Sequence, residues 1–134
     1  MKTYAEHLRN IIIKKTGSSK PFKNLKIIVD AGNGAGGFFV NDILNPLGAD
    51  TTGSQFLEPD GMFPNHIPDP ENNSAIDSIS HAVKANSADL GIIFDTDVDR
   101  AGAVDSSGKP INRNRFIALT VSYTHLRAHE TRTY

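Results

Sequence analysis

Two short apolar runs constrain the fold of this chain more than any other feature of its sequence. Residues 25–30 (LKIIVD) and residues 88–95 (ADLGIIFD) are nearly continuous apolar stretches, rich in β-branched side chains, and each ends in an aspartate. Such runs are typical of buried strands in a parallel sheet, because helices cover both faces of such a sheet. We therefore predict an α/β fold: a three-layer α/β/α sandwich with a mainly parallel sheet.

The stretches around these runs predict the remaining elements. Helices are expected in residues 3–17, in residues 38–45, in the stretch that follows Ser74 as its N-cap, and from Arg113 onward. A short strand is expected within residues 49–56, a loop rich in Pro and Asp in residues 57–72, and a hairpin in residues 102–112 with its turn near Ser107 and Gly108.

Composition narrows the class of possible partners. The chain has 134 residues, a formal net charge of −1 and no cysteine. This length suits one domain, and the near-zero charge favours neither nucleic acid nor an acidic membrane surface as a partner. No apolar run approaches the ~20 residues of a membrane-spanning helix, and the first residues show no signal-peptide pattern. We expect a cytoplasmic protein that has no disulfides and that binds neither nucleic acid nor a membrane.

The second apolar run leads directly into the sequence DTDVDR, which contains Asp95, Asp97, Asp99 and Arg100. Like charges about 4 Å apart repel by on the order of 4 kcal/mol near a protein surface, so the acids either spread into water or surround a cation. In an extended strand Asp95 and Asp99 would lie about 13.6 Å apart, so the segment must curl away from the sheet to hold one ion. Ligation by carboxylates alone is typical of Mg²⁺, which makes the three aspartates candidate metal ligands.

The same aspartates have two other interpretations. A calcium-binding EF-hand loop starting at Asp95 would need glycine and glutamate where the chain has Arg100 and Ser106, so an EF-hand is excluded. A solvated turn after a strand stays open on spacing alone. It is disfavoured because α/β folds place their sites at the carboxyl ends of strands, and because the arginine beside the acids is a good phosphate ligand.

A second motif, DAGNGAGG, follows the first apolar run. Gly32, Gly34 and Gly37 satisfy the G-x-G-x-x-G pattern of dinucleotide-binding folds, and Asp50 lies 18 residues beyond Gly32. The alternative is a strand-to-helix turn that needs small residues. The turn is favoured, because Asp50 precedes the next predicted strand instead of ending it.

The histidines form no recognisable site. His125 and His129 are four residues apart, but Leu126 stands where a zinc-protease helix has its glutamate. His66 and His81 have no ligand partners at a useful spacing. Surface or packing roles are expected for these four of the five histidines.

Three motifs, in this order along the chain, resemble the second domain of the α-D-phosphohexomutases, the family of the phosphoglucomutases and phosphomannomutases. They are LKIIVDAGNGAGG, EPDGMFPNHIPDPE and ADLGIIFDTDVDRAGAVDSSGKPINRNRFIALT, and together they span residues 25–120. In that family the D-x-D-x-D-R loop binds Mg²⁺. The resemblance therefore implies that Asp95, Asp97 and Asp99 are metal ligands here, and that Arg100 lies at the phosphoryl-transfer centre.

The resemblance also implies an activity. An enzyme phosphoserine would pass its phosphoryl group to a hexose 1- or 6-phosphate, and the bisphosphate formed would return its other phosphate to the serine. The family's serine loop, T-A-S-H-N-P, is not found in this sequence, so we expect a fragment that is inactive without other domains of the same chain. Thr96 stands where the common family form has glycine, and Asp69 where many relatives have asparagine, but neither change removes a metal ligand.

Three parts are expected along the chain. Residues 1–23 would form an N-terminal helix and linker, residues 24–120 the phosphohexomutase α/β/α domain II, and residues 121–134 a tail that departs from the family. Two alternatives stay open at this point. The glycine motif allows a dinucleotide-binding module, and the missing serine loop allows a non-enzymatic α/β domain that binds a cation or a partner protein.

Overall fold

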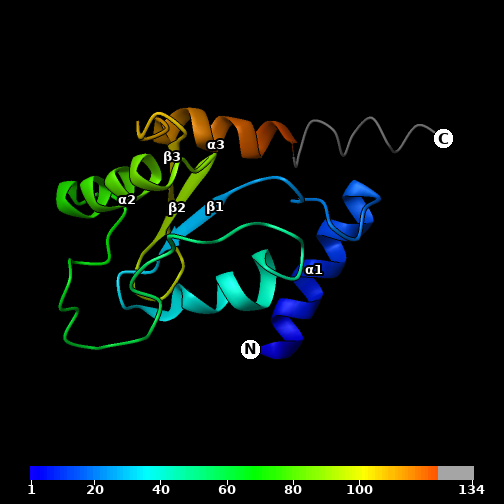
Figure 1. Cartoon of the computed structure of the whole chain (residues 1–134), viewed down its shortest axis with the longest axis horizontal. Coiled ribbons are helices and arrows are strands. Elements are labelled where there is room, and N and C mark those ends of the chain that lie inside the picture. Colours follow the sequence, from blue (N-terminus) through cyan, green and yellow to red (C-terminus); the bar gives the residue numbers. More distant parts are fainter. Residues whose placement is uncertain (124–134) are drawn as a thin grey trace.

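The computed structural model describes residues 1–123 and shows a sheet with helices on both faces (Figure 1). In chain order the elements are α1 (Lys2–Thr16), β1 (Ile27–Asp30), the 3₁₀-helix η1 (Ala35–Gly37), the π-helix η2 (Val40–Leu44), α2 (Asn73–Asn86), β2 (Leu90–Phe94), β3 (Ala101–Asp105) and α3 (Arg113–Val121). Most of the predicted tail, with His125 and His129, lies outside the described residues. No helix within residues 1–123 combines the length and apolarity needed to cross a bilayer.

The sheet has three strands in the order β1-β2-β3. β1 and β2 are parallel, with Ile27 opposite Leu90, whereas β2 and β3 are antiparallel, with Phe94 opposite Ala101. All four residues of β1 are buried, as expected for a strand with both faces covered. The predicted α/β class is confirmed, in the form of a mixed sheet.

The regular strand predicted within residues 49–56 is absent. Two isolated parallel bridges replace the strand. Asp50 pairs with Lys26, just before β1, and Gln55 pairs with Asp30, the last residue of β1. Between the bridges the Asp50 carboxylate accepts a hydrogen bond from Thr52 N at 2.9 Å, and Gly53 has a φ of 101°. A residue with positive φ turns the chain out of the extended conformation. The segment therefore lies beside β1, where a fourth strand was expected, but a turn interrupts it.

Helix α2 covers one face of the sheet and the η1–η2 segment covers the other. On the α2 side one buried apolar cluster contains Ile28, Ile79, Val83, Ile93 and Val104. On the η2 side a second cluster contains Ile27, Val29, Val40, Leu44 and Phe94. Successive β1 residues join opposite clusters because side chains alternate along a strand. The sheet thus lies between two helical layers, with one apolar cluster on each of its faces, as the predicted three-layer sandwich requires.

Helix α1 packs on the outer side of η2, where a third buried cluster contains Ala5, Ile43 and Leu47. It ends, as predicted, at Gly17, which has a φ of 70° and forms a left-handed cap. The helical segment predicted in residues 38–45 is present. Its last turn is wider than an α-helix, because the N–H of Asn45 donates to the carbonyl of Val40, five residues back.

The N-cap of α2 is Asn72. Its side-chain oxygen accepts hydrogen bonds from the backbone N–H groups of Ser74 at 3.0 Å and Ala75 at 3.4 Å. The Ser74 hydroxyl donates to the same oxygen at 2.6 Å. The prediction that Ser74 is the N-cap is therefore wrong, because Asn72 already supplies the acceptor and Ser74 lies inside the first turn.

The predicted hairpin and final helix are confirmed. β3 leads into a turn in which Gly108 has a φ of 78° and its N–H donates to the Asp105 carbonyl at 2.9 Å. Helix α3 then begins after Asn112, whose side chain accepts hydrogen bonds from Asn114 N and Arg115 N. This helix lies next to β3, at one edge of the sheet (Figure 1).

Candidate metal site

The three predicted metal ligands lie in one turn between β2 and β3. Phe94 ends β2 opposite Ala101, which begins β3, and residues 95–100 form the turn beyond this pair. Two hydrogen bonds close the turn: Asp95 N–H donates to the Arg100 carbonyl at 3.2 Å, and Arg100 N–H donates to the Asp95 carboxylate at 3.0 Å. The segment therefore curls away from the sheet, as the spacing of its acids predicted.

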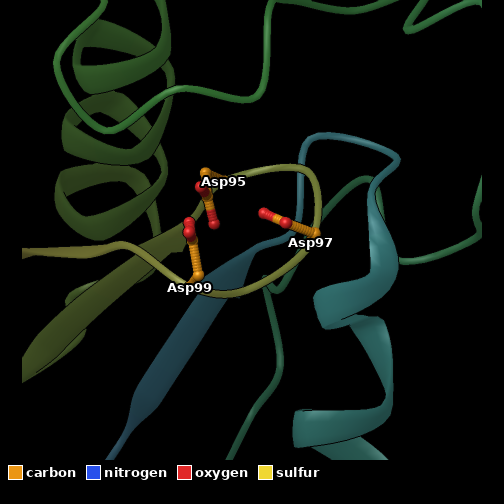
Figure 2. A group of neighbouring side chains, drawn as sticks. All are labelled: Asp95, Asp97 and Asp99. Atoms are coloured by element: carbon orange, nitrogen blue, oxygen red, sulfur yellow. The ribbon is translucent and has the colours of Figure 1, made fainter.

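The carboxylates of Asp95, Asp97 and Asp99 point toward one another (Figure 2). One oxygen from each lies within 4.8 Å of the others, and this is the one group of three potential ligands found within residues 1–123. Asp95 is buried, whereas Asp97 and Asp99 are exposed. Bonds of ~2.1 Å around an octahedral ion place neighbouring ligands roughly 3 Å apart, so small movements of the two exposed side chains would bring all three onto one small divalent cation.

Asp95 and Asp99 have pKa shifts of opposite sign. Burial raises the pKa of Asp95, but hydrogen bonds from the Arg100 backbone, from Asp99 and from the Arg100 side chain lower it by more, so the pKa lies below its usual 3.8. The pKa of Asp99 is raised, first by its hydrogen bond with Asp95 and then by the negative charges of Asp95 and Asp97. Asp95 is therefore the permanent anion of the turn, and Asp99 is the carboxyl that takes a proton first.

Arg100 holds the turn together through its side chain, of which 46% is exposed. Its Nε donates to Asp95 Oδ2 at 3.0 Å, and its Nη1 donates to Asp69 Oδ1 at 3.3 Å. The hydrogen bond with Asp95 raises the pKa of Arg100, so the guanidinium stays charged. The contact of Arg100 with Asp69, which lies in the proline-rich loop, was not expected from the sequence.

The glycine-rich loop after β1 lies against residues 95–100, which we call the metal turn because they carry the three candidate ligands. Ala35 N–H donates to the Thr96 carbonyl at 2.9 Å, and a Cβ on Gly34 would lie 2.8 Å from that same oxygen. Only a residue without a side chain allows this approach of two backbone segments. The requirement for glycine in this loop is therefore explained by its contact with the turn that carries the aspartates.

The backbone N–H groups of this loop are engaged within the protein. Five consecutive amides donate hydrogen bonds: Ala31 to Gln55 O, Gly32 to the Asp30 carboxylate, Asn33 to Phe56 O, Gly34 to Ala31 O and Ala35 to Thr96 O. A dinucleotide-binding loop needs such groups free for the pyrophosphate. Asp50, the candidate ribose ligand, instead lies beside Lys26 at the other end of β1. The geometry thus argues against the dinucleotide-binding alternative.

A buried polar cluster behind the loop was missed by the sequence analysis. Asp30 is fully buried, and its carboxylate lies 2.8–3.1 Å from four donors: Gly32 N, Gln55 Nε2, His66 Nε2 and Ser78 Oγ. His66 therefore has the packing role expected of it, while His81 is exposed. The position of Asp30 at the end of a buried apolar run was a signal in the sequence, because a buried carboxylate needs hydrogen-bond donors. The sequence does not identify those donors.

Val98 has a strained backbone within the metal turn. Its φ is 67°, in the left-handed region that β-branched residues rarely adopt. Its half-buried side chain packs against the apolar cluster that contains Phe94, which offsets the strain. Strained residues occur where a site needs a particular backbone shape.

Val98→Gly is expected to be more stable than Val98→Ala by about 1 kcal/mol. Both variants lose the packing of the valine, but only glycine also relieves the left-handed strain. Urea unfolding followed by circular dichroism measures the difference. At Ala85, an exposed position within α2, alanine should instead be better than glycine by about 1 kcal/mol. The same order at position 98 as at position 85 would show that Val98 is not strained.

A groove of about 350 Å³ opens beside Arg100, between β3 and α3. Much of its lining is apolar and includes Ile76, Ile111, Phe116 and Ile117. Asp99 and Arg100 contribute to this lining, whereas Asp95 and Asp97 do not. Of the three aspartates, Asp99 is therefore the one that faces this groove.

Comparison with known proteins decides the family of the chain. Residues 2–108 match the family described as phosphoglucomutase/phosphomannomutase, alpha/beta/alpha domain II. The chain belongs to this family. The resemblance noted in the sequence is confirmed, and the matched residues of this phosphohexomutase domain include helix α1 as well as the sheet and the metal turn.

Relatives of the phosphohexomutase domain are found in several bacteria. The phosphomannomutase/phosphoglucomutase of Pseudomonas putida is 39% identical over 103 residues, which are 77% of this chain and 22% of the relative. The phosphoglucomutase of Neisseria meningitidis serogroup A has the same identity over the same shares. A crystal structure of a phosphoglucomutase/phosphomannomutase family protein from Burkholderia thailandensis superimposes with a TM-score of 0.76 at 32% identity, covering 92% of this chain and 26% of that protein. The chain spans about a quarter or less of the length of these relatives.

Proposed function

We propose that the chain is the Mg²⁺-binding domain of an enzyme that interconverts hexose 1-phosphates and 6-phosphates through an enzyme phosphoserine and a hexose bisphosphate. The observation that carries the proposal is the cluster of Asp95, Asp97 and Asp99 beside Arg100, at the carboxyl end of β2 in a phosphohexomutase domain. Sites of α/β folds lie at the carboxyl ends of strands. The partners of the domain are then the hexose phosphate and the other domains of the same enzyme, in the cytoplasm.

Each acidic side chain has a role that its surroundings support. Asp95 is the fixed ligand, because it is buried and its lowered pKa keeps it charged. Asp97 and Asp99 are exposed and can move onto the ion. When bound, Mg²⁺ supplies positive charge that neutralises the phosphoryl group during its transfer.

Arg100 is the residue that contacts the phosphoryl group in this proposal. Its side chain is half exposed, and its charge is maintained by the hydrogen bond with Asp95. A charged guanidinium donates strong hydrogen bonds to phosphate oxygens. Positioning and charge neutralisation account for most of the catalysis of phosphoryl transfer, so this domain would supply a large part of it.

Mg²⁺ affinity is expected to fall as the pH falls, because Asp99 must lose its proton to bind the ion. The pKa of Asp99 is raised above 3.8, so its proton stabilises the folded domain, and this stabilisation is lost as the pH rises through the raised pKa. Mg²⁺ then replaces the proton. Calorimetric titration with MgCl₂ between about pH 4 and pH 8 should show an affinity that rises and then levels off. An affinity that is constant over this range would contradict the role of Asp99.

The proposed function is tested by a mutase assay of the complete enzyme that contains this chain. With glucose 1-phosphate or mannose 1-phosphate and a trace of the hexose 1,6-bisphosphate, we expect the 6-phosphate to form. EDTA should lower the rate at least about a hundredfold, and excess MgCl₂ should restore it, whereas KCl at equal ionic strength should not. An enzyme that forms no 6-phosphate, or that keeps its full rate in EDTA, would overturn the proposal.

A further inference from the structure

The Arg100 guanidinium is held by two different acids on two of its three nitrogens. Nε donates to Asp95 at 3.0 Å and Nη1 donates to Asp69 at 3.3 Å. Among the described residues 1–123, no hydrogen bond from Nη2 to a carboxylate is found. The guanidinium is planar, so fixing two nitrogens also fixes the direction in which the third donates. Asp69 therefore helps to decide where Arg100 can receive an anion.

Asp69 is itself held firmly by its own backbone surroundings. The same Oδ1 that meets Arg100 also accepts a hydrogen bond from Glu71 N at 2.9 Å. The Asp69 carbonyl accepts from Asn72 N at 3.0 Å, and the Asp69 N–H donates to the Ile67 carbonyl at 2.9 Å. A side chain with this many constraints holds its partner in one place, whereas an isolated surface ion pair contributes little.

His66 connects this loop to the protein core. Its Nδ1 lies 2.9 Å from the Ile67 carbonyl, the same oxygen that receives the Asp69 N–H. Its Nε2 lies 2.9 Å from both oxygens of Asp30. Each ring nitrogen of His66 thus lies within hydrogen-bond distance of an oxygen acceptor, so the ring is held at both ends. Asp30 accepts from three further donors, so its carboxylate is also fixed in place.

We propose that Asp69 is a positioning residue for Arg100, and that the buried pair of Asp30 and His66 positions the loop that carries Asp69. A continuous series of hydrogen bonds runs from Asp30 through His66, the Ile67 carbonyl and Asp69 to the guanidinium. Without Asp69, the guanidinium would turn toward Asp99, whose Oδ1 already lies 3.8 Å from its Nε. The inference rests on the proposed function only for the nature of the anion, a phosphoryl group.

The test measures hydrogen exchange at the Arg100 Nε–H in the ¹⁵N-labelled chain, with Arg100→Lys to assign the signal. Asp69→Ala should speed this exchange at least about fivefold, because a guanidinium that is no longer held at Nη1 leaves the Nε–Asp95 hydrogen bond more often. His66→Gln should speed it in the same direction. Asp69→Asn keeps an acceptor oxygen and should stay within about twofold of the unmodified chain. Asp60→Asn is the matched control on the same loop, since Asp60 is exposed and its carboxylate accepts a local hydrogen bond, from Met62 N.

Exchange in Asp69→Ala or in folded His66→Gln equal to that in Asp60→Asn would overturn the proposal. If circular dichroism shows that His66→Gln is unfolded, the ¹⁵N spectrum of the unmodified His66 ring decides this half instead. A proton on Nε2 that is donated to Asp30 is expected there, and a ring without that proton would overturn the buried pair.

Kinetics of the complete enzyme separate this proposal from the proposed function. Asp69→Ala should lower kcat/KM for the hexose phosphate about tenfold, and Asp60→Asn should not. A fully active Asp69→Ala enzyme would overturn the positioning role. An unmodified enzyme without mutase activity would overturn the proposed function, while the exchange experiment, which contains neither metal nor substrate, would still decide the positioning of Arg100.

Discussion

Replacing Asp97 with asparagine is expected to weaken Mg²⁺ binding by this domain about a hundredfold while leaving its fold intact. Asp97 is exposed, so its replacement disturbs no packed core. A carboxylate about 2.1 Å from a divalent ion contributes about 4 kcal/mol of attraction even at the dielectric constant of water, and a neutral amide oxygen or a water molecule recovers only part of this. Calorimetric titration with MgCl₂ measures the loss directly, and circular dichroism checks the fold.

Asp60→Asn is the matched control for this experiment. It removes the same charge from an exposed loop outside the metal turn, and the affinity for Mg²⁺ should stay within about twofold. In the complete enzyme, Asp97→Asn should abolish most of the mutase activity if the ion acts on the phosphoryl group. Unchanged Mg²⁺ affinity in the domain, or unchanged turnover in the enzyme, would contradict the proposed role of the metal turn.

The clustering of the three candidate metal ligands could be predicted from the sequence because they are close together along the chain. Asp95, Asp97 and Asp99 lie within five residues, and the apolar run before them fixes the strand that ends there. Once like charges are required to share a cation, the curl of the segment follows from distances along the chain. The partner Asp69 lies 31 residues from Arg100, and no local pattern connects the two.

The fold was predictable wherever the hydrophobic pattern was strong. Both apolar runs are strands, and helical spacing located the helices, because these patterns reflect burial on one or both faces. The prediction was wrong where polar side chains compete for the backbone. Asn72, not Ser74, caps α2, and the Asp50 side chain helps to form a turn within the expected strand. Hydrogen bonds of this kind depend on the geometry of a few atoms, which periodicity does not describe.

The structure also changes the interpretation of the glycine-rich motif. Its pattern of glycines fits a dinucleotide fingerprint, yet the same pattern is produced by a turn that must lie against a second backbone segment. The contact of Gly34 and Ala35 with Thr96 shows why the turn needs small residues here. The glycine-rich loop therefore packs against the metal turn. The loop follows the carboxyl end of β1 and the turn follows that of β2, and these two strands are parallel neighbours.

Replacing Asp30 with alanine is expected to lower the free energy of unfolding by about 3–5 kcal/mol, because several buried hydrogen-bond donors lose the acceptor that they share. The change deprives His66 of its acid and leaves three further donors, Gly32 N, Gln55 Nε2 and Ser78 Oγ, without this acceptor. Urea unfolding measures the loss. Asp50→Ala is the control, since Asp50 is exposed but also accepts a backbone N–H, and it should cost about 1 kcal/mol.

A double-mutant cycle separates the contribution of His66 from that of the other donors. Because the two side chains are in hydrogen-bond contact, His66→Leu added to Asp30→Ala should cost less than the sum of the two single changes, by about 1–3 kcal/mol, since the second change removes a ring that has already lost its partner. Where Asp30→Ala does not fold, Asp30→Asn takes its place in the cycle. Strictly additive losses would show that Asp30 acts through Gly32, Gln55 and Ser78 alone, and that His66 is held in place by its contact with the Ile67 carbonyl.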